Sequence, residues 1–319
     1  MRPTGKLHIG HYFGVLKEWL KLQDSANCYF EVADWHTLTT KYEDTENLQS
    51  NIRMMLADWI AVGIDPDKAT LFIQSSVKQH AELFLLLSML TPVGRLELVP
   101  TFKEQIRDLH LDANHTTYGL LGYPVLQAAD ILLYNAHAVP VGVDQLPHIE
   151  MTREIARKAN HIANAEIFME PKHILTQTPK IIGFDGRKMS KSLDNAIYLS
   201  DADADIDRKT KNMITDPARV KRTDKGNPDV CPVFDYHKLF ETPERAELDA
   251  GCREASIGCI DCKKHLATQI KSFLEPIHHK RSGISDNYLD DVINEGNKKA
   301  STVAEATLDK FRKAIKLEG

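Results

Sequence analysis

Residues 138–159, AVPVGVDQLPHIEMTREIARKA, place a short apolar strand directly before an amphipathic helix. The same order occurs earlier in the chain. The stretch CYFEVADWH (Cys28 to His36) predicts a strand running into a loop, and ATLFIQSS (69–76) predicts another strand. The helices expected after them cover Leu48 to Trp59 and the nearly all-apolar, hence buried, AELFLLLSML (81–90). Strands that alternate with helices form parallel sheets with right-handed crossovers, so we expect an α/β fold with a doubly wound, Rossmann-like parallel sheet.

The bulk composition limits the class of protein. The chain has 319 residues, of which 42% are hydrophobic and 27% charged, and this suits a globular protein of two domains. No apolar run approaches the ~20 residues that span a bilayer, and the polar N-terminus gives no signal peptide, so we expect a cytoplasmic protein without membrane contact. The net charge of −5 means that any nucleic acid must bind to a local basic patch.

The stretch PTGKLHIGH (Pro3 to His11) predicts a turn followed by a helix, and the first turn of that helix carries two histidines, His8 and His11. A helix N-terminus offers free N–H groups and a partial positive charge to a phosphate. Gly10 lets a flat adenine or ribose approach the backbone. His8 and His11 could donate hydrogen bonds to a phosphate that gains charge in a transition state. Two surface histidines beside a helix cap would give the same pattern, so this motif alone leaves both interpretations open.

A second motif, GFDGRKMSKSLDN (Gly183 to Asn195), places Lys188 and Lys191 three residues apart behind two glycines. Glycines suit a mobile loop, and two lysines at this spacing can close over the β- and γ-phosphates of a nucleotide and neutralise a departing pyrophosphate. Scattered lysines usually mean only an exposed basic loop. The two motifs together, in this order across an α/β region, favour nucleotide chemistry over coincidence.

HIGH (His8 to His11) and KMSKS (Lys188 to Ser192) match the two motifs of class I aminoacyl-tRNA synthetases, and the chain resembles bacterial tryptophanyl-tRNA synthetases over essentially its full length. The resemblance continues through residues 123–158 and 213–234. It implies ATP-dependent activation of L-tryptophan to an adenylate, with Mg²⁺ accompanying the ATP. It also implies transfer of the amino acid to tRNA(Trp), and a homodimer. The expected domains are a catalytic nucleotide-binding domain with a dimer-forming helical insertion (1–195) and a helical domain on the anticodon side of the tRNA (196–319).

The resemblance also assigns roles to individual residues. The expected catalytic groups are His8, His11, Lys188 and Lys191. The expected ATP-binding residues are Arg2, Pro3, Thr4, Gly10, His11, Gly142, Val143, Asp144, Lys188, Met189, Ser190, Lys191 and Ser192. The expected tryptophan-binding residues are His36, Tyr123, Gln127, Asp130, Val139, Val141 and Gln145.

Asp130 lies in the apolar stretch VLQAADILLY, where a carboxylate is costly unless it is paired. By resemblance it accepts the indole N–H. A buried acceptor of this kind rejects substrates that lack the donor, such as phenylalanine, by about 10⁴ or more. A helix-internal Asp bonded to a neighbouring backbone or Arg is the ordinary alternative. Gln127, three residues earlier, would share its helix face. Tyrosyl-tRNA synthetases also use a Gln-x-x-Asp pair in this region, so tyrosine remains the alternative substrate.

Four of the five cysteines form a C-x20-C-x6-C-x2-C pattern: Cys231, Cys252, Cys259 and Cys262. The closing C-x2-C offers two thiolate ligands on one turn, and both structural Zn²⁺ and a [4Fe-4S] cluster take four cysteines. GCREASIGCIDCKK (251–264) resembles a subset of tryptophanyl-tRNA synthetases that carries a [4Fe-4S] cluster. The cluster is therefore the expected group and Zn²⁺ the alternative, while Cys28 is expected to be an ordinary core residue.

Basic residues near these cysteines form the local patch that tRNA would require, although many could equally be a solvated face. They are Arg219, Lys221, Arg222, Lys225, Lys263 and Lys264.

Relatives normally carry a first strand before the RPTG turn, whereas Met1 already lies at that turn here. We therefore also consider a non-catalytic tRNA- or tryptophan-binding paralogue. A small-molecule nucleotidyltransferase with an H-x-G-H turn is disfavoured by the lysine motif and by the helical second half of the chain.

Overall fold

A computed structural model describes residues 1–112, 115–175, 181–191 and 193–317. The chain divides into two compact units, each built from separate parts of the sequence. Unit 1 comprises residues 1–5, 18–178 and 285–319, and unit 2 comprises residues 6–17 and 179–284. This division by compactness does not coincide with the expected boundary at residue 195, which stays a prediction about functional domains.

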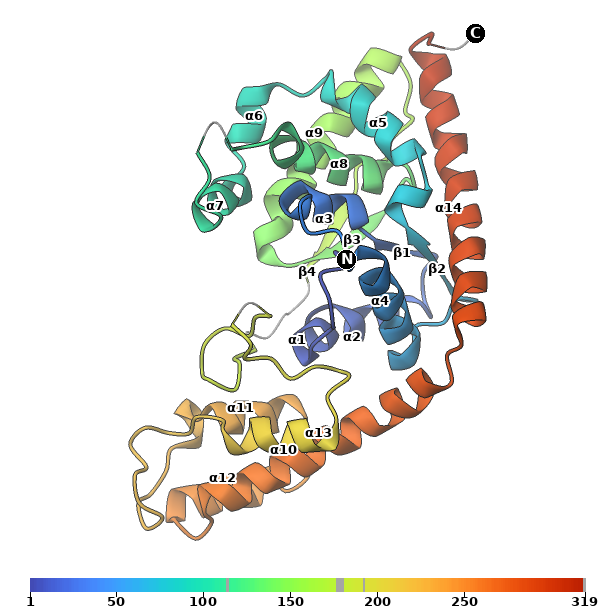
Figure 1. Cartoon of the computed structure of the whole chain (residues 1–319). Coiled ribbons are helices and arrows are strands. Elements are labelled where there is room, and N and C mark those ends of the chain that lie inside the picture. The colour runs from blue at the N-terminus through green and yellow to red at the C-terminus, as the bar shows by residue number, and fades with distance from the viewer. Residues whose placement is uncertain (113–114, 176–180, 192, 318–319) are drawn as a thin grey trace. The chain divides into compact units, whose positions relative to one another are not determined.

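Unit 1 contains the predicted alternation of strands and helices (Figure 1). Its elements are α2 (Lys17–Leu22), β1 (Cys28–Val32), α3 (Asp34–Lys41), α4 (Leu48–Val62), β2 (Ala69–Ile73), the 3₁₀ turn η2 (Gln74–Ser76), α5 (Gln79–Ser88), α6 (Val93–Glu97), α7 (Pro100–Asp108), α8 (Tyr118–Leu132), β3 (Ala138–Val141), the 3₁₀ turn η3 (Val143–Gln145), α9 (Leu146–Ala163), β4 (Lys172–Leu175) and α14 (Asp286–Ala314). The loop expected to end at His36 is instead the start of α3.

The strands pair in parallel, as predicted. β1 pairs with β2, with Cys28 opposite Ala69, and β3 pairs with β4, with Ala138 opposite Lys172. Among the described residues these pairs form two separate two-stranded sheets. Met1 lies beside the carboxyl end of β1, where its carbonyl accepts a hydrogen bond from the Ala33 N–H at 2.8 Å.

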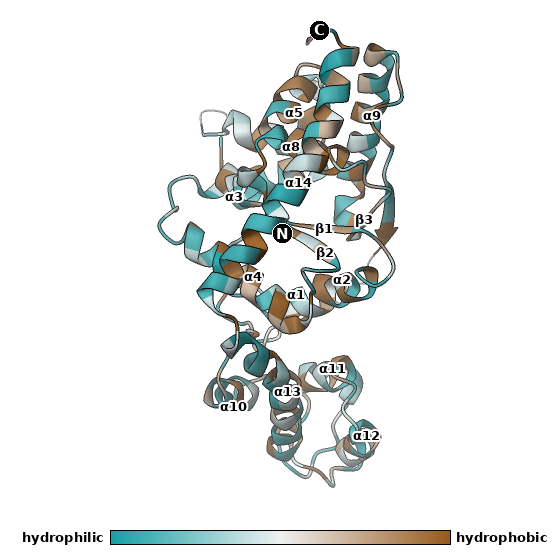
Figure 2. Cartoon of the chain, turned by 90° about the vertical axis from the view of Figure 1, so that its right-hand side faces the viewer, coloured by the Kyte–Doolittle hydropathy of each residue, from teal (hydrophilic) through white to brown (hydrophobic). Residues whose placement is uncertain are grey.

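Helix α14 packs closely on β2, although the two are far apart in the sequence (Figure 1). A Cβ atom at Gly296 would lie 1.7 Å from the carbonyl oxygen of Leu71, so only glycine permits this approach. The next residue, Asn297, accepts a hydrogen bond from the Ile73 N–H at 2.9 Å through its side-chain oxygen. Figure 2 shows hydrophilic and hydrophobic residues along α14, as expected of a helix with one buried face.

The main core of unit 1 lies among α5, α8, α9 and α14. The predicted helix at 81–90 exists as α5, but the expectation that it is buried is only partly correct. Leu83 and Leu87 are fully buried, whereas Leu85 is 54% exposed and Met89, just after the helix, is 70% exposed. The apolar residues of this segment therefore lie on two faces of the helix. One face packs in the core, and the other is exposed to solvent.

Unit 2 is helical, as predicted for the second half of the chain. Its elements are α1 (Ile9–His11), the π-helical turn η1 (Tyr12–Leu16), α10 (Asp203–Lys211), the 3₁₀ turn η4 (Pro228–Val230), α11 (Pro232–Leu239), α12 (Arg245–Glu254) and α13 (Cys259–Ser282). The N-terminal segment is held here by aromatic contacts, because the Phe13 ring lies 5.3 Å from that of Phe240 and 5.8 Å from that of Phe273. None of the described helices is long and apolar enough to cross a membrane.

Candidate active site

Backbone hydrogen bonds hold the histidine motif against the segment that comes directly after the lysine motif in the sequence. Both motifs lie in unit 2. The Ile9 N–H donates to the Ile197 carbonyl at 2.9 Å, and the Leu199 N–H donates to the Leu7 carbonyl at 2.9 Å. Leu7 and Ile9 point into the core and are 1% and 0% exposed. The histidine motif is therefore paired in antiparallel fashion with the segment that follows the lysine motif, although the two are far apart in the sequence.

Gly10 has a structural reason to be glycine. A Cβ atom at this position would lie 2.7 Å from Nδ1 of His8 and 3.5 Å from the sulfur of Met189. The His8 ring thus rests against the glycine backbone, and Met189 of the lysine motif lies nearby. Nδ1 of His8 is buried and has no hydrogen-bond partner among the described residues. A buried nitrogen of this kind suits a ligand that supplies the missing bond.

The second histidine is oriented by its own turn. Nδ1 of His11 accepts a hydrogen bond from the His8 backbone N–H at 3.1 Å, so its ring proton lies on Nε2. Burial lowers the pKa of His11 to about 3, with the neighbouring His8 and Lys191 adding to the effect. Burial and Lys191 likewise lower the pKa of His8 to about 4. Both rings are therefore neutral near pH 7, and each can donate a single N–H.

The lysine motif is organised by Asn195, which sequence reasoning missed. Asn195 is 1% exposed, its side-chain oxygen accepts from the Ser190 N–H at 2.8 Å, and its amide donates to the Lys188 carbonyl at 3.1 Å. Lys188 itself is exposed and Met189 is buried. The predicted ATP-binding residue Ser192 lies outside the described residues. The only signal for Asn195 was its place at the end of the quoted motif.

Asp130, on α8, lies at the centre of a dense polar network in unit 1. His36 Nε2 lies 2.9 Å from its Oδ2, His80 Nδ1 lies 2.6 Å from its Oδ1, and the Gln74 amide donates to both oxygens at 2.9 and 3.0 Å. Burial opposes ionisation of Asp130, but the hydrogen bonds from His36 and His80 outweigh it and hold the pKa of the carboxyl below its usual range. The carboxylate is thus an ionised acceptor, satisfied by side chains rather than by an Arg.

A second chain of hydrogen bonds joins Tyr123, on α8, to Gln145, at the start of α9. The Tyr123 hydroxyl lies 2.9 Å from His148 Nε2 and also bonds Thr101 Oγ1, while His148 Nδ1 lies 2.8 Å from the Gln145 side-chain oxygen. Burial lowers the pKa of His148 to about 4. Four of the predicted tryptophan-binding residues are therefore brought together, because the rings of His36 and Tyr123 also meet edge to face at 6.5 Å.

The remaining predicted tryptophan residues lie close by. Val139 and Val141, on β3, pack with Ile131 and Ile149 in a small hydrophobic cluster. Gln127 is partly buried on α8, one turn before Asp130.

The predicted ATP-binding residues divide between the two units. The histidine and lysine motifs belong to unit 2, whereas two further groups belong to unit 1: Arg2, Pro3 and Thr4, and Gly142, Val143 and Asp144. In unit 1 the Arg2 guanidinium bonds the hydroxyl of Thr40, and burial lowers the pKa of Arg2. Pro3 is buried, and the Thr4 N–H donates to the Arg2 carbonyl at 2.9 Å. Asp144 is exposed and accepts from the Gln145 amide at 2.8 Å.

The four patterned cysteines line one small cavity of about 20 Å³ in unit 2. Its other walls are Thr215, Arg219, Pro228, Val233 and Phe234. Burial and the neighbouring cysteines raise the pKa of Cys262 to about 12, which leaves its thiol protonated without a bound cation. Within the described residues, these sulfurs form no trio that lies mutually within 4.8 Å. Cys28 is buried in β1, as expected.

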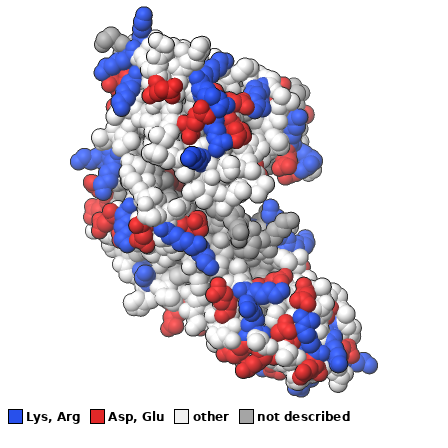
Figure 3. All heavy atoms as spheres, turned by 180° about the vertical axis from the view of Figure 1, so that it is seen from behind, with Lys and Arg blue, Asp and Glu red and all other residues white. Residues whose placement is uncertain are grey.

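Arg219 is not part of an exposed basic patch, contrary to the expectation from the sequence. It is 8% exposed, and its guanidinium donates to Cys252 Sγ at 3.5 Å and to the Ile257 carbonyl at 2.5 Å. Lys263 also donates to a backbone oxygen, that of Lys211, at 2.9 Å. The exposed members of the predicted patch are Lys221, Arg222, Lys225 and Lys264. Figure 3 shows basic and acidic side chains interspersed on the face it displays.

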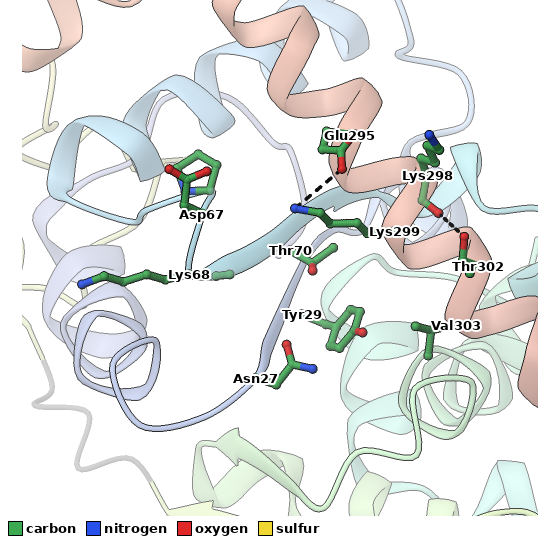
Figure 4. A pocket seen from close by; sticks show the side chains of 12 residues that line it. Asn27, Tyr29, Asp67, Lys68, Thr70, Glu295, Lys298, Lys299, Thr302 and Val303 are labelled. Atoms are coloured by element: carbon green, nitrogen blue, oxygen red, sulfur yellow. Dashed lines mark hydrogen bonds and ion pairs between the residues drawn. The ribbon is translucent and has the colours of Figure 1, made fainter.

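A larger cavity of about 440 Å³ lies in unit 1, between the amino ends of β1 and β2 and helix α14 (Figure 4). Two of its lysines form ion pairs, since Lys68 bonds Asp24 at 2.7 Å and Lys299 lies 3.7 Å from Glu295. We assign it no part in the site.

Comparisons with known proteins agree on one family. The chain matches the family described as tRNA synthetases class I (W and Y) over residues 1–275. The tryptophan–tRNA ligase of Thermotoga maritima is 51% identical over 322 residues, which cover 99% of this chain and 98% of the relative. That of Aquifex aeolicus is 43% identical over 389 residues, again covering 99% and 98%. The crystal structure of tryptophanyl-tRNA synthetase from Campylobacter jejuni complexed with ADP and tryptophan superposes with a TM-score of 0.89 at 31% identity, covering 99% of this chain and 98% of that one.

Proposed function

The chain belongs to the class I tRNA synthetases for tryptophan and tyrosine, and from that premise we propose how its own residues carry out the reaction. Its activity is that of a tryptophan–tRNA ligase. ATP activates L-tryptophan to an adenylate with release of pyrophosphate, and the amino acid then passes to tRNA(Trp). The observation that carries the proposal is the pairing of the histidine motif with the segment that follows the lysine motif. A ligase of this kind works beside translation, so the expected compartment remains the cytoplasm.

We assign adenylate formation to His8, His11, Lys188 and Lys191. Neutral His11 has its N–H fixed on Nε2, and the unpartnered Nδ1 of His8 is ready for a bond from a ligand. Lysine charge near the departing pyrophosphate stabilises the transition state more than the ground state. Mg²⁺ bound with ATP would share that charge. Lys188→Ala and Lys191→Ala should therefore slow tryptophan-dependent ATP–pyrophosphate exchange about 10²-fold while tryptophan affinity stays within about 2-fold. Equal losses in tryptophan affinity would make the loop a structural lid instead.

We propose that Asp130 selects tryptophan through its indole N–H. The carboxylate is ionised and bonds His36, and its chain neighbour Ile131 packs in the cluster of Val139 and Val141. The test is exchange supported by tryptophan against exchange supported by tyrosine, and we expect tryptophan to win by at least 10³-fold. Asp130→Asn should relax this selection more than it weakens ATP binding. Faster exchange with tyrosine would overturn the assignment, and no exchange with either amino acid would favour the non-catalytic paralogue.

We propose that Cys231, Cys252, Cys259 and Cys262 hold a [4Fe-4S] cluster. A single tetrahedral Zn²⁺, with Zn–S bonds of ~2.3 Å, draws its thiolates to about 3.8 Å from one another. The four cysteines here line one cavity, which suits either four-cysteine group, and the buried Arg219 supplies positive charge beside Cys252. A bound cluster would cross-link the loop after α10 with α12 and α13.

Protein prepared anaerobically should be brown and hold about four irons per chain, and Cys259→Ser should bleach it. We expect the variant to keep its tryptophan affinity, because the residues assigned to tryptophan lie in unit 1, whereas the cysteines lie in unit 2. About one zinc per colourless chain would replace the cluster with a structural zinc site, and metal-free protein that still charges tRNA would remove the metal proposal.

We propose that the chain forms a homodimer through the exposed apolar side chains between α5 and the start of α8. These are Leu85, Met89, Val93, Leu98, Leu109 and Tyr118, each at least 44% exposed. Apolar side chains gathered along consecutive segments mark an interface more often than isolated ones do. Light scattering should give twice the chain mass, and Met89→Glu should shift the protein toward monomer. Ile260→Glu, at a residue that is 70% exposed outside this surface, is the matched control.

We propose that tRNA contacts unit 2 at a basic patch near the cysteines. This patch consists of the four exposed basic residues Lys221, Arg222, Lys225 and Lys264. Neutralising Lys221 and Arg222 together should weaken tRNA binding and flatten its dependence on log[salt] by about two counter-ions. Adenylate formation should not change. An unchanged salt slope would show that the tRNA binds elsewhere.

A further inference from the structure

Two buried residues behind Asp130 take no part in the assigned chemistry. His80, the second residue of α5, is 0% exposed, and so is Gln74 in η2. Neither side chain reaches solvent, yet both bond the Asp130 carboxylate, His80 at 2.6 Å and Gln74 at 2.9 and 3.0 Å. Their action on a substrate must therefore pass through Asp130.

The tautomer of His80 is fixed by Asp130 and Tyr134. The Tyr134 hydroxyl lies 2.8 Å from His80 Nε2, and the Asp130 carboxylate facing Nδ1 can only accept, so the tyrosine is the donor at Nε2. His80 Nε2 is then the acceptor, so the ring proton lies on Nδ1 and points at Asp130 Oδ1. The Tyr134 ring cannot drift, because it stacks on Tyr29 at 4.7 Å and contacts Phe72 at 5.3 Å.

Glu31 is also part of this network. Its Oε2 is 3.8 Å from His80 Nδ1, longer than a hydrogen bond. Burial and the Asp130 charge raise the pKa of Glu31 well above its usual range. Glu31 also shares a hydrogen bond with Asp130 itself, so it belongs to the same network, and the 2.6 Å contact of His80 with Asp130 is the shorter of the two His80 contacts. The N-terminal amine of Met1 also faces this group, and burial lowers its pKa.

The number of acceptors on Asp130 then becomes decisive. An ionised carboxylate has about four lone-pair sites. Both oxygens already take two hydrogen-bond contacts each, His80 and Gln74 at Oδ1 and His36 and Gln74 at Oδ2. An incoming N–H must therefore replace the shared Gln74 contact at one oxygen, on a side chain that is 11% exposed. An indole N–H fills one acceptor site and supplies no competing lone pair.

We infer that His80, supported by Tyr134, is a positioning residue for tryptophan selection, holding the Asp130 carboxylate so that one acceptor site faces the indole N–H. This inference rests on the proposed role of Asp130. His80 touches neither substrate nor ATP; it acts by keeping Asp130 ionised, oriented and filled on its other sites. Removing it frees the carboxylate to rotate and removes the preference for a substrate that donates.

The test compares tryptophan with its benzothiophene analogue, in which sulfur replaces the indole N–H without changing the ring shape. The measured quantity is the ratio of kcat/KM for tryptophan to kcat/KM for the analogue in ATP–pyrophosphate exchange. Hydrogen bonds to a charged group are worth ~1.5–3 kcal/mol, so the unmodified enzyme should give a ratio of roughly 10 to 150. His80→Leu should lower the ratio toward 1, and His80→Asn, whose amide can still donate to Asp130, should regain most of it.

Each outcome decides one point. Equal losses for both substrates in His80→Leu, with the ratio unchanged, would show a structural role only and overturn the inference. A ratio near 1 in the unmodified enzyme would instead defeat the proposed role of Asp130. Should His80→Leu fail to fold, Tyr134→Phe, which keeps the ring, decides the question. It should lower the ratio at least about 3-fold, and an unchanged ratio there also overturns the inference.

Discussion

Gly10 and His8 show how a single absent Cβ organises the histidine motif. The glycine was expected to make room for a nucleotide, and the structure adds a nearer reason, because the His8 ring occupies that space. The residue between the two histidines, Ile9, anchors the turn in the core. Each position of HIGH therefore has its own physical task, and the spacing of the motif follows from them.

Gly10→Ala should displace the His8 ring, because the new Cβ would lie 2.7 Å from Nδ1. A misplacement of about 1 Å at a reacting centre costs on the order of 10²-fold, so exchange should slow by about that factor while tryptophan affinity stays unchanged. The matched control is Gly94→Ala, where no atom lies within 4 Å of the added Cβ. Normal exchange in Gly10→Ala would show that His8 is not held as described.

The buried neutral histidines predict a dependence of stability on pH. The pKa values of His8, His11 and His148 are lowered to about 4, about 3 and about 4 by burial, against about 6.5 when exposed. Between pH 6.5 and 5 the unfolded chain binds protons that the folded chain does not. Stability is therefore complete above pH 6.5 and falls as the pH drops, by at most about 1.4 kcal/mol per pH unit for each histidine.

Urea unfolding at pH 7.5, 6.0 and 5.0 measures this dependence. His11→Gln should reduce the slope of the free energy of unfolding against pH by the contribution of one histidine. A free energy of unfolding that stays flat from pH 7.5 to 5.0 would contradict the burial of these rings.

At the scale of elements, periodicity predicted three strands and three helices where they lie, β1, β2, β3, α4, α5 and α9, but it did not predict the strand β4. It could not predict which apolar face of α5 stays exposed, because a helix that is apolar all round carries no directional signal. The candidate site divides in the same way. Motif residues such as His8 and Lys188 could be found, whereas His80, Gln74 and Asn195 could not. These are single polar residues whose importance comes from burial against distant segments, and no local pattern encodes that.

The contact of α14 with β2 gives a prediction at this scale. In Gly296→Ala the added methyl group would overlap the Leu71 backbone, which cannot yield as a side chain would. Overpacking of this kind costs about 1–3 kcal/mol and here should reach the upper end or beyond. The free energy of unfolding, measured in urea, reports it. Gly283→Ala, whose nearest new contact is an ordinary 3.5 Å, should change stability by less than about 1 kcal/mol. Equal effects of the two substitutions would disprove the close approach.

At the scale of the whole molecule, neither unit is continuous in the sequence. Unit 1 needs α14 from near the end of the chain, and unit 2 needs residues 6–17 from its beginning. Arg312 on α14 reaches Glu82 on α5, and Arg53 on α4 reaches Asp286 and Asp290. Along the sequence, the helical second half is therefore preceded and followed by segments of unit 1, the unit that carries the residues assigned to tryptophan.

Ending the chain after residue 284 should destabilise unit 1 and not merely remove a terminal helix. Leu308 and Phe311 would leave the main core, and their loss exposes the partners they cover. We expect rapid proteolysis within residues 18–178 and loss of tryptophan-dependent exchange. A chain ended after Leu317 is the control and should behave as the full chain does. Stable, active protein without α14 would contradict the shared core.

The place of α14 has a consequence for how the protein is made. A ribosome adds about 5–20 residues per second, so roughly 7–27 s pass between the synthesis of residue 178 and that of residue 314 at the end of α14. For that interval the face of β2 that Gly296 will cover has no helix to cover it, while the cysteine-bearing helices are already emerging. The nascent chain must keep this apolar strand from pairing with other chains, and a pause in translation within the helical second half would lengthen its exposure.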